Sequence, residues 1–184
     1  MTIHLPYVAT SVPSASAADD RARGWARSIM RQYHFRPDAV AVLMRNCVFE
    51  VHDWGSTSGG GVAHFGRDGA PTRVVMHTAQ HEACVHECAH AWWYELERER
   101  PARKDPAVAE LIAVFRLQSL LEDGGYPVIR QHCRQFRTSM WNEELGRWSH
   151  DEIFASLASA VMCDMRRMPV GFHGVYGEML VMPQ

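Results

Sequence analysis

Lysine is almost missing from this chain, and so is any excess of positive charge. A single lysine stands beside 18 arginines, and 21 acidic residues outnumber the two together. The formal net charge is therefore −2. This balance gives no electrostatic reason to expect a nucleic acid or an anionic membrane as a partner.

Cysteines are few, and the sequence has no apolar run long enough to cross a membrane. Five cysteines at irregular spacing suggest no disulfide framework, so we predict a reducing, cytoplasmic compartment. Ala15-Ser16-Ala17 has the form of a signal-peptidase site, but no basic stretch precedes it and prolines interrupt the apolar part. We expect a loosely structured arm at residues 1–17 and a single domain at residues 18–184.

The clearest chemical signal is the segment His86-Glu87-Cys88-Ala89-His90. Residues four apart on an α-helix lie about 40° apart around its axis, so both imidazoles can reach one ion. Glu87 lies about 100° from His86, where it can hold a water on that ion but is badly placed as a ligand. This is the HExxH pattern, in which two histidines bind Zn²⁺ and the glutamate is a general base. The alternative is an ordinary amphipathic helix with two surface histidines.

The flanking sequence favours the metal site. Apolar residues at helical spacing accompany the histidines and predict a helix packed on a core: Val85, Cys88, Ala89, Trp92 and Leu96. We interpret Cys84 and Cys88 as small buried residues. Residues 72–77 predict a β-strand that leads into this helix, with Thr78 as its N-cap.

The remaining pattern predicts an α+β fold, with a small mixed sheet beside the HExxH helix and several further helices. Further strands are expected at residues 47–52 and 62–65, separated by a glycine-rich loop. Helices are expected from residue 19 or 20 to 33, at 106–122, at 127–138 and from about 150 to 165. Residues 38–45 fit either a helix or a strand.

A catalytic zinc needs a third protein ligand and an open position for water. Trp93 and Leu96 stand where the extended metzincin motif has glycine and histidine, so that branch is excluded. The best candidate is Glu152, at the start of a helix whose small residues would let a neighbouring helix approach closely. Ser149 and Glu152 also form a capping-box pattern. In that pattern the Glu152 carboxylate would accept a hydrogen bond from the Ser149 amide instead of binding metal. The competing ligands are Glu143, Asp151 and His150, and the remaining alternative is no third ligand at all.

His86-Glu87-x-x-His90 followed by Glu152-Ile153-Phe154-Ala155 resembles the compact gluzincin zinc peptidases, such as lethal-factor-type and IrrE/ImmA-type enzymes. The resemblance covers about residues 47–94 and 149–165 and is specific for the clan, not for one family. Two features depart from the IrrE-like pattern: the long separation of His90 and Glu152, and the late position of Met168-Pro169. The resemblance implies a zincin-like fold with zinc bound by His86, His90 and Glu152.

The predicted function is a zinc-dependent peptidase acting on a peptide or protein, with oligomeric state left open. Zinc would polarise the scissile carbonyl, while Glu87 takes a proton from water and passes it to the leaving amine. An oxyanion also needs a donor; the candidates are Tyr176, His173, Tyr126 and His150. The alternative is a non-catalytic zinc-binding regulatory or interaction protein with the same fold, its fourth position closed by a side chain such as His150.

Gly61-Val62-Ala63-His64-Phe65 is the segment best suited to bind substrate. A glycine-rich approach leaves backbone groups open, and an extended peptide could pair with such a sheet edge. We therefore predict Gly61, Val62, Ala63 and His64 as substrate-binding residues, with the Ala63 amide facing outward. The alternative is an ordinary hairpin strand.

Overall fold

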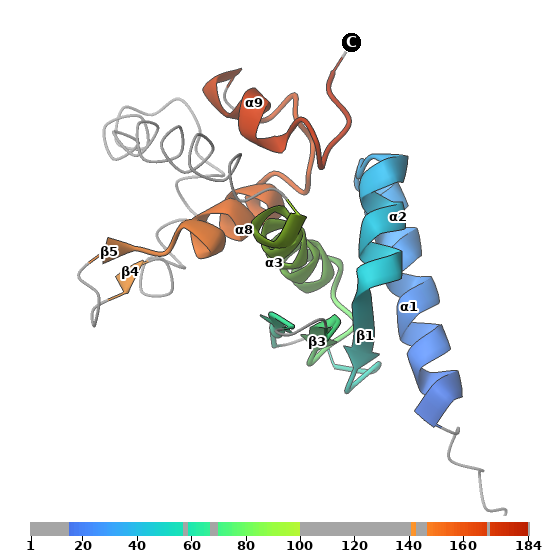
Figure 1. Cartoon of the computed structure of the whole chain (residues 1–184). Coiled ribbons are helices and arrows are strands. Elements are labelled where there is room, and N and C mark those ends of the chain that lie inside the picture. The colour runs from blue at the N-terminus through green and yellow to red at the C-terminus, as the bar shows by residue number, and fades with distance from the viewer. Residues whose placement is uncertain are drawn as a thin grey trace, which may run out of the picture.

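The computed structural model of this chain describes residues 15–56, 59–66, 70–99, 141–142, 147–168 and 170–183 (Figure 1). Within these ranges the fold is α+β, as expected. Several expectations lie outside them: the helices at 106–122 and 127–138, Tyr126, Glu143 and most of the N-terminal arm. The division into an arm and one domain stays a prediction. No helix among the described ranges combines the length and apolar character that crossing a membrane requires.

The sheet has three strands, β1 (Cys47–Val51), β2 (Gly61–His64) and β3 (Thr72–Met76), in the order β1-β3-β2. β1 runs parallel to β3, and β2 runs antiparallel to it. The sheet is therefore mixed, and β2 lies at one of its edges. All three strands were predicted, with bounds that differ by one residue at either end.

Two helices precede the sheet. α1 (Ala15–Gln32) begins four residues before the earliest start we expected, and α2 (Pro37–Asn46) resolves the ambiguous segment as a helix. Proline in the first turn is already set to a helical φ, and Asp38 there is favourable near the helix dipole. One side of α2 is buried in the core: Ala39, Val40, Leu43 and Met44. α1 packs against β1 and α3.

The long helix α3 (His81–Glu99) occupies the centre of the molecule, between the sheet and α8 (His150–Ala160) (Figure 1). The predicted apolar stripe is confirmed, since Val85, Cys88 and Ala89 have no exposed surface. The N-cap assignment was wrong by two residues: Gln80 precedes the helix and its carbonyl accepts from the Cys84 amide at 3.1 Å. Thr78 instead accepts a hydrogen bond from the Gln80 amide at 3.1 Å.

α8 is shorter than expected. It ends at Ala160, because Met162 and Cys163 have positive φ angles of 49° and 57°, which a right-handed helix cannot contain. The chain continues through η1 (Val170–Phe172) and α9 (His173–Tyr176), and a short hairpin of β4 (Trp141–Asn142) and β5 (Arg147–Trp148) precedes α8. The small residues of α8 are buried against α3 as predicted, including Ala155, Ser156 and Ser159.

Candidate metal centre

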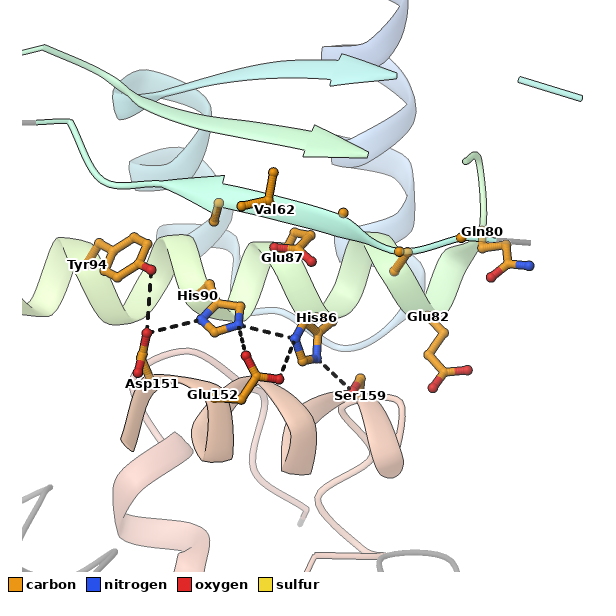
Figure 2. Close-up of a pocket in the computed structure, with 15 residues that line it drawn as sticks. Val62, Gln80, Glu82, His86, Glu87, His90, Tyr94, Asp151, Glu152 and Ser159 are labelled. Atoms are coloured by element: carbon orange, nitrogen blue, oxygen red, sulfur yellow. Dashed lines mark hydrogen bonds and ion pairs between the residues drawn. The ribbon is translucent and has the colours of Figure 1, made fainter. Parts of the chain in front are cut away.

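Two imidazoles project from one face of α3 towards α8 (Figure 2). His86 and His90 are one helical turn apart, and their Nε2 atoms lie 3.2 Å from each other. The rings meet edge to face, with centroids 4.8 Å apart. Both Nε2 atoms are therefore directed at a single position, as the HExxH spacing on a helix predicts.

Glu152 supplies a carboxylate from the first turn of α8. Its two oxygens lie 3.2 Å from His90 Nε2 and 3.4 Å from His86 Nε2. One ligand atom from each of the three residues fits within a span of 4.8 Å, which is the only such cluster of three in the described ranges (Figure 2). The three predicted ligands are thus brought together from two helices far apart in the sequence.

The competing capping role of Glu152 is not what the structure shows. Ser149 is the N-cap of α8, but it makes no side-chain cap hydrogen bond. Its hydroxyl donates to Asp151 Oδ1 at 2.5 Å, and the Glu152 carboxylate faces the histidines and accepts from Ser156 Oγ at 3.3 Å. Glu152 is therefore available as a ligand.

The surroundings of the two rings place polar groups at their Nδ1 atoms, while the Nε2 atoms face Glu152. Ser159 Oγ donates to the Ser156 carbonyl at 3.1 Å, so it accepts from His86 Nδ1 at 3.4 Å. His90 Nδ1 lies 3.8 Å from Asp151 Oδ2. When both protons sit on Nδ1, two lone pairs and a carboxylate converge at one position. They repel one another unless a proton or a cation lies between them, and a divalent metal satisfies all three.

The charge of Glu152 fits that arrangement. In the metal-free protein the Nε2 atoms can instead carry protons and donate them to Glu152. Burial alone would raise the pKa of this carboxyl, but these hydrogen bonds from His86 and His90 outweigh it and hold the pKa well below its usual range. The first turn of α8 adds the positive end of the helix dipole. An ionised carboxylate with two imidazoles is a donor set that suits Zn²⁺.

Glu87 points away from this cluster, towards β2, and is only 4% exposed. The Ala63 amide donates a hydrogen bond to its carboxylate. Gly61 lies against the same side chain, because a Cβ at that position would be 2.7 Å from Glu87 Cγ. Burial raises the pKa of Glu87 to about 7, with His86 opposing the rise and Glu152 adding to it. A carboxyl group that titrates near neutrality is suited to general base catalysis.

The open edge of β2 runs beside the candidate metal site. The His77 amide donates to the Gly60 carbonyl at 2.9 Å, so in this antiparallel register Val62 and His64 direct their backbone groups at β3. Gly61 and Ala63 direct theirs outward. The outward direction expected for the Ala63 amide is therefore correct, but that amide already donates a hydrogen bond to Glu87. Substrate binding by residues 61–64 stays a prediction.

A cleft of about 630 Å³ joins these features, with β2 and its glycine-rich approach on one side and α3 and α8 on the other. The residues that line it include both histidines and four carboxylates, those of Glu82, Glu87, Asp151 and Glu152. The cleft is large enough for a short segment of peptide rather than only for an ion.

Two residues of the cleft make contacts that the sequence pattern did not predict. Tyr94 lies one turn beyond His90 on the same face of α3, and its hydroxyl donates to Asp151 Oδ2 at 3.5 Å. Burial, with the charge of Asp151, raises the pKa of Tyr94 above its usual range. The spacing of four residues from His90 was a signal in the sequence. Asp151, a rival ligand by its sequence position, lies at Nδ1 of His90 and not at Nε2.

The candidate oxyanion donors among the described residues lie elsewhere. Tyr176 is buried, and its hydroxyl donates to the Phe154 carbonyl at 2.7 Å. His173 Nε2 lies 3.1 Å from the Met168 carbonyl. Neither residue lines the cleft, and neither does His150, the expected closing ligand.

The buried thiols take no part in the cluster. Cys84 and Cys88 have no exposed surface, as expected, and their sulfur atoms lie 4.0 Å apart. The hydrogen bond with Cys84, together with burial, raises the pKa of the Cys88 thiol well above its usual range. A thiol that keeps its proton is a poor metal ligand.

Comparison with known proteins adds no relative. The chain matches no model of a known protein family, and searches among curated proteins and solved structures also gave no match. The support for the candidate metal site is therefore its own geometry.

Proposed function

We propose that this protein is a zinc-dependent peptidase. The observation that carries the proposal is the convergence of His86 Nε2, His90 Nε2 and a Glu152 oxygen within 4.8 Å, with Glu87 next to the first ligand but directed elsewhere. Two imidazoles and one carboxylate leave a fourth zinc position open, as catalysis requires. The likeness of the motif to compact gluzincins supports the same reading.

Different residues that line the cleft would bind the metal and transfer the proton. His86, His90 and Glu152 would hold Zn²⁺, which supplies Lewis acidity to a carbonyl and to water when bound. Glu87 accepts a proton from the attacking water and delivers it to the leaving amine. The Ala63 amide holds the Glu87 carboxylate in place, while the outward carbonyls of Gly61 and Ala63 remain for pairing with an extended peptide.

The position of Glu87 favours an enzyme over a zinc-binding regulatory protein. A site that only holds metal has no need for a carboxylate buried beside it, since burying that charge costs free energy. Glu87 nevertheless lines the cleft and has a pKa of about 7 because it is buried there.

Metal content is the first test. Protein purified without added metal should contain about one zinc per chain, and His86→Ala should lose most of it. His52→Ala is the matched control, because His52 is an exposed histidine after β1. Equal zinc content in wild type and His86→Ala would refute the site.

Catalysis is the second test. Glu87→Gln should keep its zinc, because the residue is not a ligand, yet lose hydrolysis of a fluorescent casein or peptide library by several orders of magnitude. Equal cleavage by Glu87→Gln and wild type would refute the role of Glu87 as a base.

A further inference from the structure

Tyr94 completes a row of three side chains on one face of α3. It follows His86 by eight residues and His90 by four, so all three project into the cleft (Figure 2). Its ring lies nearly parallel to that of His90, with centroids 6.2 Å apart and an angle of 24°. Phe65, the residue after β2, also contacts it, with ring centroids 5.3 Å apart. The ring is therefore held by contacts with both the segment that follows β2 and the candidate ligand His90.

The hydroxyl of Tyr94 is held less firmly than the ring. Its hydrogen bond to Asp151 Oδ2 is 3.5 Å long, at the outer limit for such a bond. Asp151 already has a short bond from Ser149 to its other oxygen, and Oδ2 also faces His90 Nδ1 at 3.8 Å. A tyrosine keeps its proton at neutral pH, so this hydroxyl is a donor that a better acceptor can draw away from Asp151.

We propose that Tyr94 is a catalytic residue whose hydroxyl donates a hydrogen bond to the substrate oxygen that becomes negatively charged beside the metal. This inference rests on the proposed peptidase function. The donor side chains first considered for that task lie outside the cleft or outside the described residues. Ser159, which does line it, is engaged by the Ser156 carbonyl and His86. Tyr94 is placed next to the ligands, with a hydroxyl that can turn from Asp151 to the substrate.

Tyr94→Phe tests the hydroxyl alone, because phenylalanine keeps the ring that contacts His90 and Phe65. The probe is inorganic phosphate, whose tetrahedral anion imitates the charged intermediate of peptide hydrolysis. Zinc is first loaded to one equivalent, and phosphate binding is then measured by isothermal titration calorimetry. Tyr33→Phe is the matched control, since Tyr33 contacts His81 at the start of α3 and does not line the cleft.

We expect Tyr94→Phe to bind zinc as tightly as wild type and phosphate about tenfold more weakly, as the loss of one hydrogen bond to a charged group implies. Tyr33→Phe should match wild type in both titrations. Unchanged phosphate affinity in Tyr94→Phe, or no phosphate binding by zinc-loaded wild type, would overturn the inference. So would weaker zinc binding in Tyr94→Phe, which would make the hydroxyl a support for His90. Failure of wild type to bind zinc at all would instead overturn the proposed function.

Discussion

Burial of the Glu87 carboxylate should make the metal-free protein less stable at neutral pH, and Glu87→Gln should remove that penalty. The pKa of Glu87 rises from an ordinary value of 4.5 to about 7, mainly because the side chain is buried. That difference corresponds to a free energy of about 3 kcal/mol. Glutamine keeps an oxygen for the Ala63 amide and carries no charge.

The sign follows from where the proton sits in each state. Below about pH 4.5 the group is protonated in both folded and unfolded chains, so Glu87 causes no change of the free energy of unfolding with pH. As the pH rises, the unfolded chain releases its proton first, and the folded protein must either keep the proton or bury a charge. Wild-type stability attributable to Glu87 therefore falls between pH 4.5 and about 7 and is constant above that.

Urea unfolding of wild type and Glu87→Gln, both stripped of metal with the same chelator, measures the effect. The free energy of unfolding of the variant relative to wild type should increase by about 3 kcal/mol between pH 4.5 and 8. Any fixed cost of burying the amide shifts both ends equally and leaves this increase unchanged. Glu82→Gln, an exposed glutamate on the same helix, is the control and should show little change. A difference that is flat with pH, or that falls, would refute the argument.

Three further changes test the neighbouring contacts. Gly61→Ala should destabilise the protein by about 1–3 kcal/mol in urea unfolding, because the new Cβ would lie 2.7 Å from both Glu87 Cγ and the Val75 carbonyl. Gly60→Ala is the control and should be nearly neutral, since a Cβ there has no neighbour within 4 Å. Ser159→Ala should lower zinc affinity about 10- to 100-fold in a chelator competition, since it removes the acceptor at His86 Nδ1, and unchanged affinity would contradict that role. Ala63→Pro should reduce cleavage while zinc content is retained, and it should steepen the pH dependence of stability, because losing the amide that donates to Glu87 raises the pKa of that carboxyl further.

The parts of the fold that the sequence predicts are those fixed by local periodicity. The HExxH spacing sets His86 and His90 on one face whatever surrounds the helix, and the strands are short apolar runs between turn residues. Residues 38–45 were ambiguous because alternating valines fit a strand as well as a helix. The structure resolves them as a helix that begins at Pro37 and buries one side.

Glu152, the candidate third ligand, shows that a local sequence pattern is not enough to assign a residue's partners. Ser149-x-x-Glu152 is a capping box by sequence, and the same carboxylate could close a metal site on α3; no local rule decides between them. The decision comes from packing. Buried small residues of α8, such as Ala155 and Ser156, bring its first turn against α3, where two imidazoles offer Glu152 stronger partners than one backbone amide does. Ser149 then turns to Asp151, which in turn faces His90 Nδ1 and the hydroxyl of Tyr94. The contacts of Asp151 and Tyr94 thus depend on how two distant helices meet, and that is why the sequence predicts the candidate ligands but not the residues that contact them.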